Sequence, residues 1–511
     1  MAEPRIVLIS TDEAIVGMGV KTLSSCLIKG GFDTAVVLMP TSAENYNNFH
    51  WDDLEEICKY ACLVGISCMT HGVQKAIEVK QAIEKKILAP IMIGGIHASL
   101  DSESLLNNFN LVCHGEGEDL IVELANRLIN NMPYCDIPGL WIKRDSNIIR
   151  NPSCPLKRDL DGYPFPDYDL SHQFILEGEQ LVPMKPVQGH ILFDDFVVLG
   201  SRGCPHHCTY CSNQKIKDEF PWRKQVRHYS VNHLINHLKE VCKIYPQVKG
   251  FWIEDDTFFI KELEEIADFS QRYEKRINKP FFVLVSPWTF SEDKLKLLID
   301  AGMNKMIMGI QSGSENTNYN IYERNISNER IMEIAQTLHK YSYIKICYDF
   351  IGMNPFEKEA DFIDTIRLIK KFPHPFFIYN NNLAFYPGTK LYEQALRAGI
   401  DVNRRIKHSE STIGYSILKN ENIQHKIFHF ILLLMAGDAN SFRIGFMPRF
   451  LLSDFFIAFY SFLNQRLTLL TNFIINRISF FVLHKSLKRI TRSYFLYGIL
   501  SRLKSLYLRI R

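Results

Sequence analysis

The sequence predicts an α/β protein made of two successive sheets and a helical carboxy-terminal region. Three observations predict it. Short apolar runs alternate with amphipathic stretches near the amino terminus, the same alternation resumes after residue 190, and the last part of the chain is apolar and basic. At 511 residues the chain is too long for a single core, so several units are expected.

The first unit, residues 1–132, has the pattern of a doubly wound, flavodoxin-like sheet. A helical segment is predicted at 73–86. Ligands of such sheets bind beyond the carboxyl ends of the strands. The runs typical of buried parallel strands are 5–10, 34–39, 62–67, 89–95 and 110–115. The candidate ligand loops that follow these strands are 11–19, 67–71, 94–99 and 115–117.

Residues 133–190 are rich in Pro, Gly and Asp and are predicted to form a connector. Its segment 159–170 is expected to be extended, because each proline disfavours helix at the preceding residue. Residues 191–395 form a second α/β series, which predicts a full or partial (β/α)6 barrel with its chemistry at the strand ends. The strand-like runs of this series are 195–201, 250–255, 281–286, 305–311, 345–352 and 377–385.

Three cysteines lie close together after the first strand of the second series, in SRGCPHHCTYCSNQ. Cys204, Cys208 and Cys211 could bind three irons of a [4Fe–4S] cluster and leave the fourth iron open, as a catalytic site requires. The alternatives are a zinc site completed by His206 or His207, and three unrelated thiols. The spacing, the position after a strand and the lack of a fourth nearby cysteine favour the cluster.

The other cysteines of the twelve are scattered and do not suggest a disulfide framework. No secretory signal precedes the first strand-like run at Arg5. These features predict a reducing, cytoplasmic compartment.

The CxxxCxxC spacing resembles the radical S-adenosylmethionine (SAM) superfamily. The resemblance implies that the open iron binds the methionine end of SAM, and that one electron cleaves SAM to a 5′-deoxyadenosyl radical. By the same resemblance, the acidic segment WIEDDTF would contact the methionine amino end of SAM. The alternative is that it forms a solvated acidic turn. DFIGMNPFE (349–357) resembles the family's fifth-strand segment but departs from it at Asn354 and Phe356, and FYPGTKLY (385–392) resembles its closing segment. The implied SAM-binding residues are Tyr210, Glu254, Asp255, Asp256, Gln311 and Ser312.

The first unit resembles the cobalamin-binding domain that precedes the radical domain in one large subfamily. The matching segments are IGGIHAS (93–99), CHGEGED (113–119), IPGLW (137–141) and the DLDGYPFPD connector. Glycines there would let a flat ligand approach the backbone. The implied cobalamin-binding residues are Ser67, Gly94, Gly95, Gly115 and Gly117.

The sequence has no Asp-x-His-x-x-Gly motif to supply a histidine to cobalt, as many members of the subfamily also lack it. His71 and His97 lie on candidate loops, where a lone histidine is more often merely solvated. The alternative for the whole unit is a flavodoxin-like domain that only packs on the barrel.

Residues 396–511 are predicted to be helical and basic. Residues 441–511 contain 12 Lys or Arg and one acid, Asp454. An apolar stripe and a basic stripe predict either a helical cap on the barrel or a peripheral contact with anionic lipids. Nucleic-acid binding is not expected. The stripes consist of Leu496, Ile499, Leu503, Leu506 and Ile510 on one side, and Lys485, Lys488 and Arg492 on the other.

The resemblances together imply a cobalamin-dependent radical SAM enzyme, a methyltransferase acting on an unactivated carbon. Its expected partners are a small-molecule or lipid substrate, a reductant such as flavodoxin or ferredoxin, and a membrane surface at the inner face of the cell membrane. The alternatives are a radical cyclase or oxidase without net methyl transfer, a methylthiotransferase, and a non-catalytic cobalamin- or lipid-surface-binding protein. No catalytic residue can be named from the sequence.

Overall fold

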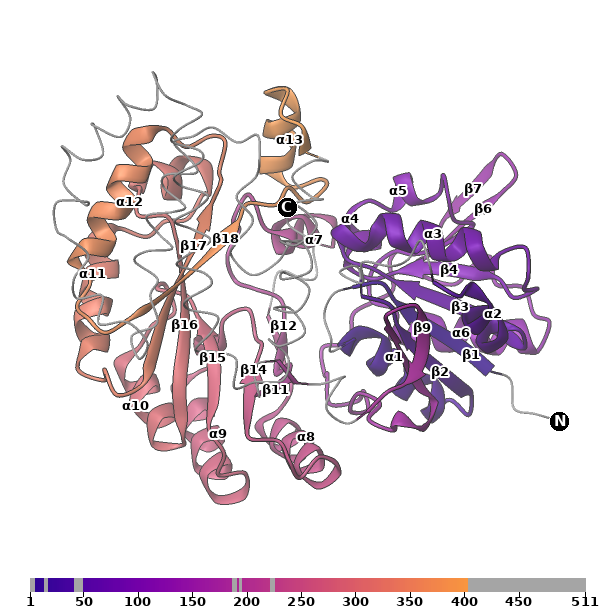
Figure 1. The fold of residues 1–511 in the computed structure, drawn as a ribbon, viewed down its shortest axis with the longest axis horizontal. Coiled ribbons are helices and arrows are strands. Elements are labelled where there is room, and N and C mark those ends of the chain that lie inside the picture. The colour runs from indigo at the N-terminus through magenta and orange to yellow at the C-terminus, as the bar shows by residue number, and fades with distance from the viewer. Residues whose placement is uncertain are drawn as a thin grey trace, which may run out of the picture.

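The computed structural model describes residues 5–12, 17–40, 49–185, 191–192, 195–220 and 226–402 (Figure 1). The basic tail from residue 403 onward lies outside the described residues. The helical cap and the membrane contact expected there therefore stay predictions. Within the described ranges, no helix is long and apolar enough to cross a membrane.

The amino-terminal sheet has nine strands in the order β7-β6-β5-β4-β3-β1-β2-β8-β9. Its centre, from β5 to β8, is parallel, and its edges are antiparallel. The strands are β1 (Arg5–Ser10), β2 (Asp33–Leu38), β3 (Ala61–Ser67), β4 (Ile91–Gly94), β5 (Leu111–Cys113), β6 (Leu140–Arg144), β7 (Asn147–Arg150), β8 (Gln173–Glu177) and β9 (Gln180–Pro183). The helices are α1 (Met18–Lys29), α2 (Trp51–Cys58), α3 (Val73–Ile83), α4 (Ile96–Leu100), α5 (Ser102–Leu105) and α6 (Glu118–Ile129).

Apolar residues cover both faces of this sheet, as a doubly wound fold requires. Val7 and Ile9 of β1 belong to the core that contacts α2 and α3, whereas Ile6 and Leu8 belong to the core that contacts α1 and α6. Strand β1 lies between β2 and β3, so the chain reverses its direction of winding there. All five strands predicted for the first unit are present, and the predicted doubly wound sheet is confirmed.

The predicted connector at 133–190 is wrong in part, because β6 to β9 come from this stretch and extend the sheet at both edges. These strands have only four or five residues, and their apolar runs are no longer than three residues, so the sequence pattern does not reveal them. Residues 151–169 contain no helix or strand, in agreement with the extended segment expected there.

The second sheet forms an open barrel, with the order β10-β11-β14-β15-β16-β17-β18. Six of its strands are parallel, and they match the six predicted runs. The strands are β10 (Ile191–Leu192), β11 (Asp195–Val198), β14 (Gly250–Ile253), β15 (Phe281–Val285), β16 (Met303–Gln311), β17 (Lys345–Gly352) and β18 (Phe377–Asn382). The helices are α7 (Ser212–Glu219), α8 (Val231–Ile244), α9 (Leu263–Arg276), α10 (Glu292–Asp300), α11 (Asn328–His339), α12 (Glu359–Lys371) and α13 (Lys390–Arg397).

Side chains of the barrel strands alternate between the outer helices and the interior. Met306 and Met308 of β16 pack in the main core with the helices, whereas Ile307 joins Phe282 and Cys347 in a smaller cluster. This alternation assigns Cys347 and Asp349 of β17 to the same inner row. Polar residues at the carboxyl ends of these rows are therefore positioned to meet a ligand.

Candidate functional site

The three clustered cysteines lie on the loop 203–211 between β12 (Ser201–Arg202) and α7. All three are free thiols. Lys217 of α7 folds back over this loop, donating from Nζ to the carbonyl oxygen of Cys204 (3.0 Å) and to that of His206. Helix α7 therefore holds the cysteine loop in place from its carboxy-terminal side.

The surroundings of two of the three cysteines, Cys204 and Cys211, disfavour the thiolate form. Burial raises the pKa of Cys204 to about 12 and that of Cys211 to about 11, and Asp256 contributes to both shifts. Iron must therefore displace protons when a cluster assembles. Three thiolates without a fourth cysteine are the donor set that an open [4Fe–4S] cluster needs, so the residues fit this cofactor.

A zinc site was the alternative for these cysteines. In the part of the chain that the structure describes, no three His, Cys, Asp or Glu side chains are grouped to hold a metal ion. A single zinc ion would hold all of its sulfur ligands at about 2.3 Å from one metal, whereas a four-iron cube binds each thiolate to a different iron. His206, one of the two candidate fourth zinc ligands, lies edge-on to Trp288, with ring centroids 5.6 Å apart.

Two of the three predicted acidic SAM contacts, Glu254 and Asp256, are accessible at the carboxyl end of β14. Desolvation raises the pKa of Glu254 to about 7, with a further contribution from Asp256. Asp255 is different, because it is fully buried, accepts from the Gly200 backbone NH (2.6 Å) and pairs with Lys261 (2.5 Å). The arrangement favours Glu254 and Asp256 as ligand contacts and gives Asp255 a structural role.

Of the two SAM contacts predicted at the end of β16, Gln311 is available to a ligand and Ser312 is already hydrogen-bonded. Gln311 has a positive φ of 71°, and its buried Oε1 has no partner among the described residues. A Cβ at Gly309 would lie 2.6 Å from Gln311 Nε2, so a larger residue there would displace this amide. Ser312 is 1% exposed and donates to Glu357 Oε1 (3.0 Å), so its hydroxyl already has a partner.

Arg324, which the sequence reasoning missed, joins the cysteine loop to the barrel. Its Nη1 donates to Cys208 Sγ and to the Tyr210 hydroxyl (3.3 Å each), and its Nη2 donates to the carbonyl oxygen of Gly309 (2.9 Å). Tyr210 packs edge-on against Tyr322, with centroids 4.8 Å apart. A half-buried guanidinium thus contacts a predicted cluster ligand and a predicted SAM-binding residue.

Arg324→Gln is expected to lower the midpoint potential of the reconstituted cluster. Reduction adds negative charge, which a nearby half-buried cation stabilises, and glutamine removes that cation while keeping a donor. A tenfold change in a one-electron equilibrium corresponds to about 59 mV, and a fall of this order is expected in a redox titration followed by electron paramagnetic resonance. Arg330→Gln, which removes an exposed pair with Glu333, is the control. An unchanged or higher potential in Arg324→Gln would contradict the prediction.

Asp349 is a second residue that the sequence reasoning did not single out. It lies in the inner row of β17 and accepts from Asn381 Nδ2 (2.7 Å). Desolvation raises its pKa to about 7, while hydrogen bonds from Asn381 and Gln311 oppose the shift. The carboxyl group therefore changes charge near neutral pH beside a predicted SAM contact. Nothing in the sequence pattern of β17 separates it from an ordinary strand residue.

A cavity of about 160 Å³ lies at the carboxyl ends of β1, β3 and β4, where the winding of the first sheet reverses. All five predicted cobalamin-binding residues line it: Ser67, Gly94, Gly95, Gly115 and Gly117. At Gly95, with φ of 92°, a Cβ would lie 2.6 Å from the Cys68 carbonyl oxygen, so glycine is required there.

The cavity fits part of a large flat ligand but is too small to enclose a whole corrinoid. Apolar side chains such as Leu8, Met92 and Ile121 complete its walls. His97 is buried and bonded to Thr70 Oγ1 (3.2 Å), and burial lowers its pKa to about 4. Neither His71 nor His97 lines the cavity.

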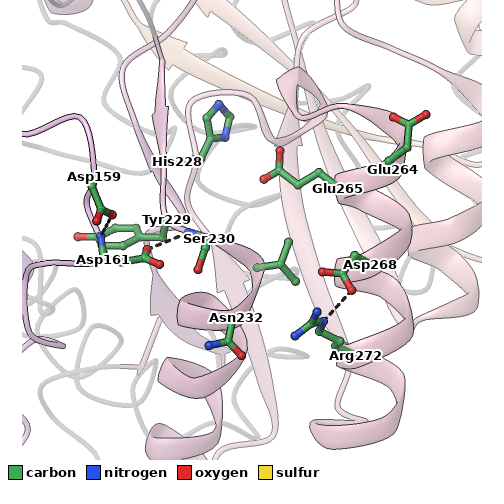
Figure 2. A pocket seen from close by; sticks show the side chains of 11 residues that line it. Asp159, Asp161, His228, Tyr229, Ser230, Asn232, Glu264, Glu265, Asp268 and Arg272 are labelled. Carbon is green, nitrogen blue, oxygen red and sulfur yellow. Dashed lines mark hydrogen bonds and ion pairs between the residues drawn. The ribbon is translucent and has the colours of Figure 1, made fainter.

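A separate, acidic pocket lies outside the barrel, between the connector and the amino-terminal turns of α8 and α9 (Figure 2). Asp159 and Asp161 line one side, and Glu264, Glu265 and Asp268 line the other. It contains none of the predicted site residues. The candidate functional site therefore consists of the cysteine loop, the barrel strand ends and the cavity of the first sheet.

The fold and the site define an α/β protein with a ligand-binding amino-terminal sheet and an open barrel that carries a three-cysteine loop. Family models match the same two units, the B12 binding domain at residues 4–125 and the Radical SAM superfamily at residues 198–369. The chain belongs to the radical SAM enzymes that carry an amino-terminal B12 binding domain. The cofactors of this family are a [4Fe–4S] cluster, SAM and cobalamin.

Curated relatives and solved structures agree with this membership. An uncharacterized methyltransferase of Pyrococcus horikoshii is 26% identical over 350 residues, which cover 65% of this chain and 69% of the relative. The bacteriochlorophyllide d C-8(2)-methyltransferase of Chlorobaculum tepidum is 23% identical over 362 residues, covering 66% and 69%. The structure of the radical SAM methyltransferase TsrM from Kitasatospora setae, with cobalamin and a [4Fe–4S] cluster bound, superposes with a TM-score of 0.61 at 14% identity. That match covers 78% of this chain and 75% of TsrM and shows the shared fold.

Proposed function

We propose that this protein is a cobalamin-dependent methyltransferase that acts on an unactivated carbon of a small-molecule or lipid substrate. The observation that carries the proposal is the presence in one chain of a three-cysteine loop and a cavity lined by every predicted cobalamin-binding residue. Two similar proteins named as methyltransferases support the type of reaction.

In this proposal the cysteine loop holds the cluster through Cys204, Cys208 and Cys211, and the cavity holds cobalamin. Bound SAM and cluster supply a 5′-deoxyadenosyl radical, and bound cobalamin supplies the methyl group. The SAM-binding residues are Tyr210, Glu254, Asp256 and Gln311. Asp255 and Ser312 support them, because each is already bonded to a protein group.

The chain's own groups bind and orient the reactants. Asp349, Asn381 and Gln311 present a carboxyl group and two amides in the interior of the barrel, where they would orient a substrate through hydrogen bonds. A turnover consumes two SAM and two electrons. It converts R–H to R–CH3 and releases 5′-deoxyadenosine, methionine and S-adenosylhomocysteine. The electrons would come from a reductant such as flavodoxin or ferredoxin, in a cytoplasmic setting or at the inner face of the cell membrane.

The test needs no knowledge of the substrate. The full chain is reconstituted anaerobically with iron, sulfide and hydroxocobalamin, then incubated with a reductant and SAM labelled in its methyl group. A methyltransferase is expected to form 5′-deoxyadenosine and also to release S-adenosylhomocysteine, with the label retained on the bound corrinoid. A radical cyclase or oxidase would form 5′-deoxyadenosine without labelling the corrinoid. A non-catalytic binding protein would form neither product.

A further inference from the structure

Two charged loops meet between the cavity of the first sheet and the cysteine loop. Arg202 is the last residue of β12, two positions before Cys204, and it pairs with Glu116 (3.4 Å) and Glu118 (2.7 Å). Arg227, opposite Arg202 on β13 (Arg227–His228), pairs with Glu116 as well. The four side chains, named here the interdomain ion network, are each at most 22% exposed.

Both carboxylates of this network belong to the cobalamin cavity. Glu116 and Glu118 line it together with Gly115 and Gly117, because all four residues lie on the loop between β5 and α6 or at its end. The two arginines lie on the barrel side of the boundary. The network therefore links the cavity loop to the residue that precedes the cysteine loop.

The other end of the cysteine loop is held by the same domain. Helix α7 begins directly after Cys211, and its residue Ile216, with Phe220 just beyond the helix, packs with Leu100 and Ile96 of α4. Helix α4 follows Gly95 of the cavity and lies beside α7 at the boundary between the two domains (Figure 1). Phe220 also contacts His114, with ring centroids 4.8 Å apart.

Each end of the cysteine loop is thus attached to one of the two glycine loops that line the cavity. Fixing either loop restricts the conformations open to the other, and coupling between two binding sites is reciprocal. A partly buried set of two arginines and two glutamates resists separation, because removal of one partner leaves a charge uncompensated.

We propose that the interdomain ion network couples cobalamin binding to cluster assembly, so that each cofactor strengthens the binding of the other. Arg202 and Arg227 act as positioning residues that set the cysteine loop against the cobalamin cavity. The proposal rests on the assignment of the two cofactor sites under Proposed function.

The test measures the affinity of the full chain for hydroxocobalamin by equilibrium dialysis, once with the cluster assembled and once with iron-free protein. Couplings between sites are typically about 5- to 150-fold, and cluster assembly is expected to tighten hydroxocobalamin binding by at least about 5-fold. In Arg202→Gln the ratio of the two affinities should fall toward 1, although either cofactor still binds alone. Arg227→Gln removes the pair with Glu116 from the barrel side of the boundary and should act alike if Arg202→Gln does not fold.

Arg150→Gln is the matched control, because Arg150 of β7 makes an exposed bidentate pair with Glu103 inside the first domain and has no part in the network. Its affinity ratio should equal that of the native protein. A ratio of 1 in the native protein, or a native ratio retained in both network variants, would overturn the proposal. Failure of the native chain to bind either cofactor would instead overturn the cofactor assignment and the proposal with it.

Discussion

Cys208→Ala is expected to abolish formation of 5′-deoxyadenosine from SAM, a loss of at least about 1000-fold. The cluster needs three thiolates, and the described chain offers no fourth cysteine on the loop to replace one. The variant also leaves the Arg324 guanidinium without its sulfur acceptor. Iron and sulfide content after anaerobic reconstitution, together with product analysis by chromatography, measure the effect.

The matched control is Cys242→Ala, because Cys242 lies on α8 in the same domain and only packs against the core. It should keep a full cluster and full SAM cleavage. Hydroxocobalamin retention by Cys208→Ala should weaken only by the coupling factor described above, because the cavity itself is intact. A Cys208→Ala protein that still cleaves SAM reductively would show that the three cysteines do not hold the catalytic cluster.

The fold was predictable because buried parallel strands have continuous apolar runs. Ile6 to Ile9 must be apolar on both faces of the sheet, so β1 is visible in the sequence alone. The edge strands β6 to β9 lack this requirement. Their side chains are partly exposed, and only their pairing with β5 and β2 identifies them.

Site residues could be predicted from the sequence where a cofactor requires several of them close together along the chain. The three cysteines lie within eight positions of one another, and the cavity glycines occupy two short loops, so both groups are recognisable as motifs. Arg324 and Arg202 are different, because the side chains that they contact are more than 80 positions away in the sequence. The contacts of Arg324 depend on how the barrel folds and those of Arg202 on how the two domains meet, and no local pattern encodes either.

Gly94→Val is expected to reduce hydroxocobalamin retention by at least about tenfold, which corresponds to 1.4 kcal/mol. Gly94 lines the cavity at the end of β4, and its φ is not positive, so the backbone accepts a side chain. A Cβ there would lie 3.5 Å from Cys113 Cβ, an ordinary contact. Valine is favoured in strands, so the variant should fold while its methyl groups occupy space that the cofactor needs.

The informative result is that Gly94→Val loses cobalamin but keeps the iron–sulfur cluster. With excess iron and sulfide, Gly94→Val should still assemble a cluster and form 5′-deoxyadenosine, yet it should not transfer the SAM methyl group to a corrinoid. Gly162→Val, on the connector, where a Cβ would meet only the Asp159 carbonyl oxygen at 3.9 Å, should behave like the native protein. If Gly94→Val retains cobalamin as the native protein does, the corrinoid does not occupy this cavity. The five predicted residues would then belong to a glycine-rich turn region of a domain that binds the cofactor elsewhere.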